Sequence, residues 1–329
     1  MRLFITAFLI VPLVFTTAKA QAVFQRSFIK MGSAFDLTLV AQNQIKADIL
    51  MQEAIDEIER IERLISSWDP ASETSRVNQM AGKEAVIVSK ELFNLVVRAK
   101  AIASLTSGAF DPTYASVDQI WTFNGAIMDW PSADKITASV IKIGFEKIQL
   151  NPVDQSLYLP LEGMKIGFGA IGKGYAADRV KSLLQKKGVT AGIINASGDM
   201  SAWGEQPTGK PWQIGLVNPM NKNKVFTWFP IKNQAVVTSG DYEKFVTIEG
   251  KRYGHIINPK TGYPSWGVIS CTVFAPKAEL ADALSTALFV MGIKTGIDFI
   301  DQLKQVEAIM IDDTGQVFTS KNIQINETT

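Results

Sequence analysis

The chain contains one histidine, His255, and this residue lies in the polar stretch from Val236 to Pro264. An imidazole titrates near neutral pH and can carry a proton during catalysis, although a single histidine is about as often a hydrogen-bonded core residue. The same stretch contains Ser239, Asp241, Tyr242, Asn258 and Thr261. A purely structural hairpin needs no such set of polar side chains, which favours catalysis. We therefore place a candidate catalytic site at His255, with Asp241 as a candidate partner.

A second candidate site lies on the helix predicted from Lys277 to Gly292, which is apolar on its leucine side. Asp282, Ser285 and Thr286 share the opposite face, because residues three or four positions apart are neighbours on a helix. A carboxylate on a mostly buried helix needs a cation or several hydrogen-bond donors. One interpretation is a hard cation such as Mg²⁺, bound together with substrate phosphate oxygens. The alternative is a structural hydrogen bond from Asp282 to a neighbouring loop.

A third candidate is the glycine-rich run KIGFGAIGKG, residues 165–174, which opens another predicted helix. Glycines at such a position let backbone amides approach an anion, and Lys173 would add a point charge for a phosphate. The run is not a Walker loop, because Gly172-Lys173 is followed by Gly174 and not by Ser or Thr. An anion site and a close-packed helix start both remain open.

Two more carboxylates follow short turns. Asp111 precedes a proline directly after a predicted helix that ends at Ser107-Gly108, and its type and place are those of a turn or cap residue. Asp199 ends the turn of residues 196–199, where we expect a solvated carboxylate. Trp68, in the loop before Pro70, is expected to cover a helix end.

Strands and helices that could position these groups are predicted from hydrophobic periodicity. Helices are expected over residues 45–65 and 92–102 and strands over residues 28–41, 192–195, 212–217, 225–229 and 234–238. Residues 244–248 and 252–256 predict a hairpin, which would place His255 on a strand. No repeat or low-complexity linker divides the chain. We expect an α+β fold, with interleaved mixed sheets and packed helices, as a single domain over residues 21–329.

Composition excludes some classes of protein. With 329 residues and 47% hydrophobic content, the chain can bury a large core. Its 33 basic and 32 acidic residues nearly balance, so we expect no nucleic-acid partner.

The first 20 residues have the pattern of a secretory signal peptide: Arg2, an apolar run from Leu3 to Phe15, and Ala18-Lys19-Ala20 as a cleavage signal. The alternative is an uncleaved membrane anchor, although the apolar run is short for a span. Cys271, the sole cysteine, is far from the cleavage signal, so we expect no lipid anchor. These features predict a soluble exported protein, periplasmic or otherwise extracytoplasmic.

Taken together, these segments resemble one family, the FAD:protein FMN transferases, also called ApbE-like or flavin-trafficking proteins. The resemblance spans nearly the whole chain after the signal. It rests on seven motifs in order: Met31-Gly32-Ser33; Ser67-Trp68 through Ser75-Arg76-Val77-Asn78; Ser107 through Thr113; Ala170 through Ala176; Thr238 through Tyr242; Gly254 through Pro259 with Thr261-Gly262; and Ala281 through Thr286.

The resemblance implies a cleft that binds FAD. The matching FAD contacts are Met31, Trp68, Ala109, Phe110, Asp111, Lys173 and Ile257. The family's Mg²⁺ site matches the backbone carbonyl of Ala170 and the side chains of Asp282, Ser285 and Thr286. His255 matches the family histidine associated with catalysis, and Asp241 matches the polar segment near it. One position departs from the family, which usually has an acidic residue where this chain has Gly167.

The implied reaction is transfer of FMN from FAD to a threonine of an acceptor protein, with release of AMP. A membrane-bound redox subunit is the acceptor that the resemblance implies. Two alternatives remain open: a Mg²⁺-dependent pyrophosphatase that hydrolyses FAD to FMN and AMP, and a flavin-binding carrier without catalysis.

Overall fold

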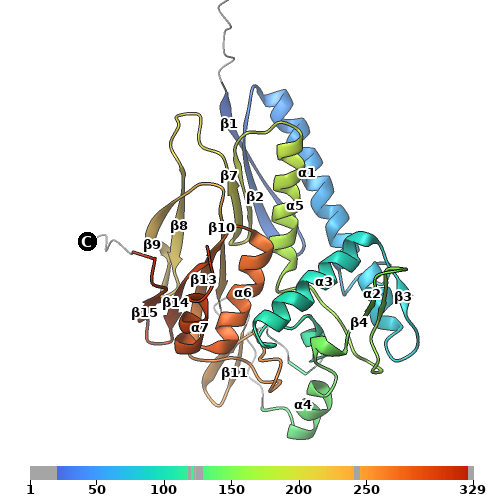
Figure 1. The fold of residues 1–329 in the computed structure, drawn as a ribbon. Coiled ribbons are helices and arrows are strands. Elements are labelled where there is room, and N and C mark those ends of the chain that lie inside the picture. The colour runs from blue at the N-terminus through green and yellow to red at the C-terminus, as the bar shows by residue number, and fades with distance from the viewer. Residues whose placement is uncertain (1–20, 118–119, 122, 124–128, 241–244, 325–329) are drawn as a thin grey trace, which may run out of the picture.

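An eight-stranded sheet joins segments from both ends of the chain (Figure 1). The structure is a computed structural model and describes residues 21–117, 120, 121, 123, 129–240 and 245–324. The strand order is β1-β2-β6-β7-β10-β13-β14-β15. These strands are β1 (Ala22–Lys30), β2 (Ser33–Ala41), β6 (Gly192–Ala196), β7 (Asp199–Trp203), β10 (Ala235–Gly240), β13 (Val268–Ala275), β14 (Glu307–Asp312) and β15 (Val317–Thr319).

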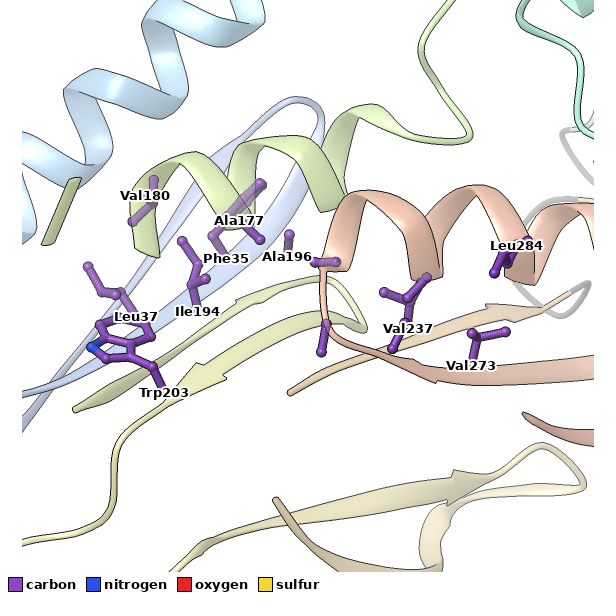
Figure 2. Packing of buried hydrophobic residues seen from close by; sticks show 14 of the residues in the cluster. Phe35, Leu37, Ala177, Val180, Ile194, Ala196, Trp203, Val237, Val273 and Leu284 are labelled. Carbon is purple, nitrogen blue, oxygen red and sulfur yellow. The ribbon is translucent and has the colours of Figure 1, made fainter. Parts of the chain in front are cut away.

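Helices cover one face of this sheet. They are α1 (Gln44–Ile65), α5 (Gly172–Lys186), α6 (Ala278–Met291) and the shorter α7 (Ile293–Ile300). Figure 2 shows side chains of α5 and α6, among them Ala177 and Leu284, directed at buried strand residues such as Phe35 and Val237. The alternation of β2 explains this packing, since Phe35, Leu37 and Leu39 point to the same face and are fully buried.

A two-stranded ribbon covers the other face. It consists of β8 (Trp212–Asn218) and β9 (Asn221–Ile231), paired antiparallel. Trp212 and Ile214 of the ribbon join a core with Val236 and Phe274, which alternate with the helix-facing residues of β10 and β13. The central strands of the sheet are therefore buried on both faces.

A smaller group of elements continues from α1 and α5 and encloses a second core (Figure 1). It contains α2 (Glu73–Gln79), α3 (Lys90–Leu105), α4 (Ala133–Val140), the 3-10 helices η1 (Pro112–Val117) and η2 (Phe145–Lys147), and a sheet of β3 (Val86–Ile87), β5 (Ser156–Tyr158) and β4 (Gln149–Asn151). A last hairpin, β11 (Phe245–Ile248) and β12 (Lys251–Gly254), adjoins it.

Helices α5 and α6 cap each other at their first turns. Asp178 of α5 accepts hydrogen bonds from the backbone N–H groups of Ala278 and Glu279 at 3.1 and 3.0 Å. Asp282 of α6 in turn accepts one from the N–H of Gly174 at 3.0 Å. The first N–H groups of a helix have no partner within the helix, so each carboxylate satisfies groups that the other helix leaves open.

Glycine makes this exchange possible. A Cβ at Gly174 would overlap the carbonyl oxygen of Ala278 and would lie 2.8 Å from Cβ of Asp282. The two helices therefore approach backbone to backbone at this point.

The α+β class with packed helices is confirmed, and strands from the whole chain alternate in one sheet. Each pairing among the described strands is antiparallel, however, so the sheets are not of mixed direction. The hairpin prediction was wrong at one end, because β12 stops at Gly254 and His255 lies just beyond it. Within the described residues, no helix has the length and apolar content to cross a membrane.

We predict that Asp178→Ala lowers the free energy of unfolding by about 2–3 kcal/mol, because two buried N–H groups lose a charged acceptor. Asp298→Ala is the control, since this exposed residue pairs only with Lys294 on its own helix turn among the described contacts. The control should lose about 0.5 kcal/mol or less. Denaturant titration measures both, and equal losses would contradict the capping role.

Candidate functional site

A buried cluster of charge lies where α5, α6 and β7 meet. Lys173 Nζ lies 2.7 Å from Oδ2 of Asp199, and both Asp199 and Asp282 are almost fully buried. The Asp199 carboxylate reaches this place because Ser197 and Gly198, both with positive φ, form a tight turn between β6 and β7. Two carboxyl groups therefore share one ammonium group inside the protein.

The pKa values of both carboxyl groups are raised. Burial raises the pKa of Asp282 well above its ordinary value, and the nearby charge of Asp199 raises it further. Burial also raises the pKa of Asp199, although the Lys173 ammonium opposes that shift. A carboxylate pair with one lysine is therefore short of positive charge.

Hydroxyl groups extend this site along α6. Ser285 Oγ donates a hydrogen bond to the carbonyl of Asp282 at 2.9 Å and lies 2.7 Å from Oγ of Ser239, at the end of β10. Because the Ser285 proton is already used, Ser239 donates to it, and one lone pair of Ser285 stays available. Thr286 follows on the same helix and is half-buried. The predicted polar face of α6 thus borders the charge cluster.

The glycines of residues 165–174 allow close packing, each against a different neighbour. A Cβ at Gly172 would lie 2.8 Å from Cδ1 of Ile65, and Gly174 meets the backbone of α6. The Gly174 amide is already engaged by Asp282, and Lys173 pairs with Asp199. The structural interpretation of this helix start is supported, and the anion site at Lys173 stays a prediction.

The donors around the cluster fit a hard cation. They are oxygens: the carboxylates of Asp282 and Asp199 and the hydroxyl of Ser285. The hydroxyl of Thr286 and the backbone carbonyl of Ala170, two residues before α5, stay predicted ligands. Oδ2 of Asp199 is buried and, beyond its ion pair with Lys173, accepts no hydrogen bond from the part of the chain that the structure describes. No group of three or more His, Cys, Asp or Glu side chains suited to a metal occurs among the described residues. One or two carboxylates with further oxygens is the set that Mg²⁺ uses when substrate phosphates complete its shell.

His255 is exposed at the end of β12, beside a cluster of aromatic rings. Its ring lies 6.5 Å from that of Phe123, edge to face. The rings of Trp121, Trp130, Tyr253 and Tyr263 pack nearby, with centroids 5.1–6.2 Å apart. Ile257 packs against this cluster and forms a bridge with Pro264. The loop that holds His255 is thus braced by residues from the segment after η1.

Asp111 has a structural role of its own. Its Oδ1 accepts hydrogen bonds from N–H and Oγ1–H of Thr113 at 2.8 and 2.6 Å, and its Oδ2 accepts one from N–H of Phe145 at 2.9 Å. Burial raises its pKa despite these bonds. The sequence prediction of a cap residue is confirmed, and its contact with FAD remains a prediction.

The other predicted FAD contacts lie in several places. Ala109 and Phe110 are buried, and Met31, in the β1–β2 turn with φ of 52°, is half-buried. Met31 packs against both cores. Trp68 is 81% exposed and does not cover a helix end, which corrects the expectation from sequence. An exposed ring at this point is available to a flat ligand.

Two parts of the predicted site are not described. Asp241 lies outside the described residues, so its place beside His255 stays a prediction. The FAD cleft also stays a prediction. A hollow of about 590 Å³ is lined by Arg98, Tyr175, Asp178, Lys277 and their neighbours on α3, α5 and α6, and it contains none of the predicted site residues.

Sequence reasoning missed Asp199. The expectation of a solvated turn was wrong, because the side chain is buried and paired with Lys173. The signal was the repeated Ser-Gly-Asp sequence, residues 197–199 and 239–241, which comes directly after a predicted strand or one residue beyond it in both places. The same motif in two places suggests similar roles, yet Asp199 was interpreted as a solvated turn residue and Asp241 as a candidate catalytic partner.

The chain matches the sequence model of the ApbE family over residues 31–310. Among curated proteins, it is 30% identical to the FAD:protein FMN transferase of Klebsiella pneumoniae (strain 342) over 300 residues, which cover 91% of this chain and 92% of that protein.

Solved structures are similar in fold. The ApbE protein of Thermotoga maritima superposes with a TM-score of 0.84 at 30% identity, covering 91% of this chain and 97% of that one. The flavinyl transferase ApbE of Pseudomonas stutzeri, in its apo form, superposes with a TM-score of 0.81 at 25% identity, covering 92% and 95%.

We predict that Asp111→Ala lowers the free energy of unfolding by about 2–4 kcal/mol in the absence of any ligand, because three donors lose their acceptor. Asp154→Ala is the control. It removes an exposed carboxylate that accepts one bond from Ser156 and should cost about 1 kcal/mol or less. A loss for Asp111→Ala no larger than that of the control would show that its hydrogen bonds do not stabilise the fold.

Proposed function

This chain belongs to the ApbE family, and we propose that it is an FAD:protein FMN transferase that uses Mg²⁺ and moves FMN onto a threonine of an exported acceptor protein. The observation that supports this function best is the buried cluster of Lys173, Asp199 and Asp282, beside the hydroxyl face of α6. A divalent cation would supply the positive charge that these two carboxyl groups lack, and the diphosphate of FAD would complete its shell.

Different residues of the cluster would bind the cation and the diphosphate of FAD. Asp282 is held in place by the N–H of Gly174 and by the positive end of α5. Together with Ser285, Thr286 and the carbonyl of Ala170, it would hold the cation. A bound Mg²⁺ neutralises charge on the diphosphate of FAD. Lys173 would exchange its ion pair with Asp199 for a contact with a phosphate oxygen.

The transfer step exchanges the phosphoanhydride bond of FAD for a phosphate ester to threonine. The threonine oxygen of the acceptor bonds to the FMN-side phosphorus of FAD, and the bond from that phosphorus to the bridging oxygen breaks. AMP leaves with the bridging oxygen. His255, exposed at the end of β12, accepts the threonine proton, directly or through Asp241.

The place of action is also proposed from the sequence. Residues 1–20 have the pattern of a secretory signal, so the acceptor would be an extracytoplasmic protein, such as a membrane-bound redox subunit. The acceptor must offer its threonine in a segment that can reach an exposed histidine.

One assay distinguishes transfer from its alternatives. The protein is incubated with FAD and Mg²⁺, with and without a flavin-acceptor domain, and the denatured acceptor is examined for covalent flavin while AMP is measured. Labelled acceptor with equal AMP supports transfer. AMP without acceptor would show hydrolysis, and FAD binding with neither product would show a carrier.

We predict that His255→Ala slows transfer by about 100-fold or more, as loss of a general base does, while FAD affinity changes little. Because the variant leaves a space at the surface, added imidazole should restore part of the rate. Transfer at the original rate would remove His255 from the mechanism.

Asp282→Asn should weaken binding of Mn²⁺, a probe for the Mg²⁺ site, by about tenfold or more, since one of two carboxylates loses its charge. Asn can still accept the bond from Gly174, which limits the structural damage. Asp178→Asn is the matched control on the neighbouring helix and should leave Mn²⁺ affinity unchanged. Calorimetry measures both, and equal affinities would place the metal elsewhere.

A further inference from the structure

Gly167 and Gly169 precede Ala170, and backbone conformation does not explain them. Neither has a positive φ, so a residue with a side chain could adopt the same backbone. Glycine at such positions indicates that another group approaches closely. The question is which group occupies the space.

The space over both glycines is filled by consecutive residues of η1. A Cβ at Gly167 would lie 2.9 Å from Cβ of Ala115. A Cβ at Gly169 would lie 2.5 Å from the hydroxyl oxygen of Tyr114, whereas the ring carbon Cζ is 3.7 Å away, an ordinary contact. At Gly169, therefore, the phenol hydroxyl alone sets the limit.

Hydrogen bonds hold the two segments against each other just before these glycines. The N–H of Gly167 donates to the carbonyl of Pro112 at 2.8 Å, and the N–H of Lys165 donates to Oγ of Ser116 at 3.0 Å. From the other side, Asn78 donates to the carbonyl of Ile166 and accepts from its N–H, at 2.9 and 2.8 Å. The position of η1 over this loop is therefore well defined.

These contacts join two parts of the proposed FAD site. The 3-10 helix η1 directly follows Asp111, and the glycine loop leads directly to Ala170 and Lys173. We propose that Tyr114 is a positioning residue, whose hydroxyl holds the backbone at Gly169 and so sets where the Ala170 carbonyl and Lys173 stand. This inference rests on the proposed function, because FAD is the ligand whose binding it affects.

The same packing accounts for Gly167, which departs from the family pattern. An acidic side chain there would meet the methyl group of Ala115. Alanine at 115 and glycine at 167 therefore form a matched pair, and the partly buried phenol of Tyr114 lies over the loop that lacks the acid.

The test uses steric complementation, with FAD affinity measured by flavin fluorescence. Gly169→Ala should weaken FAD binding about tenfold or more, because the new methyl group and the Tyr114 hydroxyl cannot both keep their places. Adding Tyr114→Phe removes only the hydroxyl and should bring affinity back to within about threefold of Tyr114→Phe alone. Tyr158→Phe, on β5, is the control and should give no recovery in the Gly169→Ala background.

The outcomes separate this inference from the proposed function. Unchanged affinity in Gly169→Ala, or equal recovery with Tyr158→Phe, would overturn the role of Tyr114. If the unmodified protein binds no FAD, the proposed function fails. The packing of Tyr114 on Gly169 is then tested by the thermal unfolding temperature, which should fall in Gly169→Ala and recover with Tyr114→Phe but not with Tyr158→Phe. Loss in Gly169→Ala without recovery in the Tyr114→Phe double variant overturns the inference in either readout.

Discussion

The close approach of α5 and α6 at their first turns is the constraint on which the rest of the structure depends. Backbone meets backbone at Gly174 and Ala278, and no side chain fits between them. At this separation the open N–H groups of each helix cannot be solvated, so each must find an acceptor on the other helix. Asp178 and Asp282 supply those acceptors.

This arrangement also explains how an anionic site can be buried. Asp282 serves as a cap, so the positive end of α5 offsets part of the cost of removing its charge from water. Asp199 lies at the start of β7 and pairs with Lys173 in the first turn of α5. The carboxylates are thereby placed close together before any cation is present, and a cation of suitable size gains from that placement.

Much of the fold could be predicted because it follows from periodicity. The helices at α1, α3 and α6 and the strands at β8, β9 and β10 have regular apolar patterns, and the polar face of α6 was evident from spacing alone. The partners of Asp282 could not be found in this way. Gly174 is 108 residues away in the chain, and no local pattern specifies which helices will touch.

Errors occurred where local chemistry was ambiguous. Asp199 follows Ser-Gly, which is typical of exposed turns, and its burial follows from the neighbouring strands and from Lys173. His255 was assigned to a strand because the predicted hairpin extended to residue 256, yet pairing ends at Gly254. The close match of Tyr114 to Gly169 is invisible in sequence, because it depends on a distance between atoms in separate loops.

The order of strands in the large sheet has a consequence for how this chain matures. β2, from the first part of the chain, pairs with β6, and β10 pairs with β13 near the end. Such long-range pairing slows folding, since distant segments must meet before either is stable. In a ribosome-bound chain that does not yet include α6, Lys173 and Asp199 lack Asp282, the third residue of the charge cluster. The site is therefore completed late, after synthesis has passed residue 282, and a shortened product would lack it.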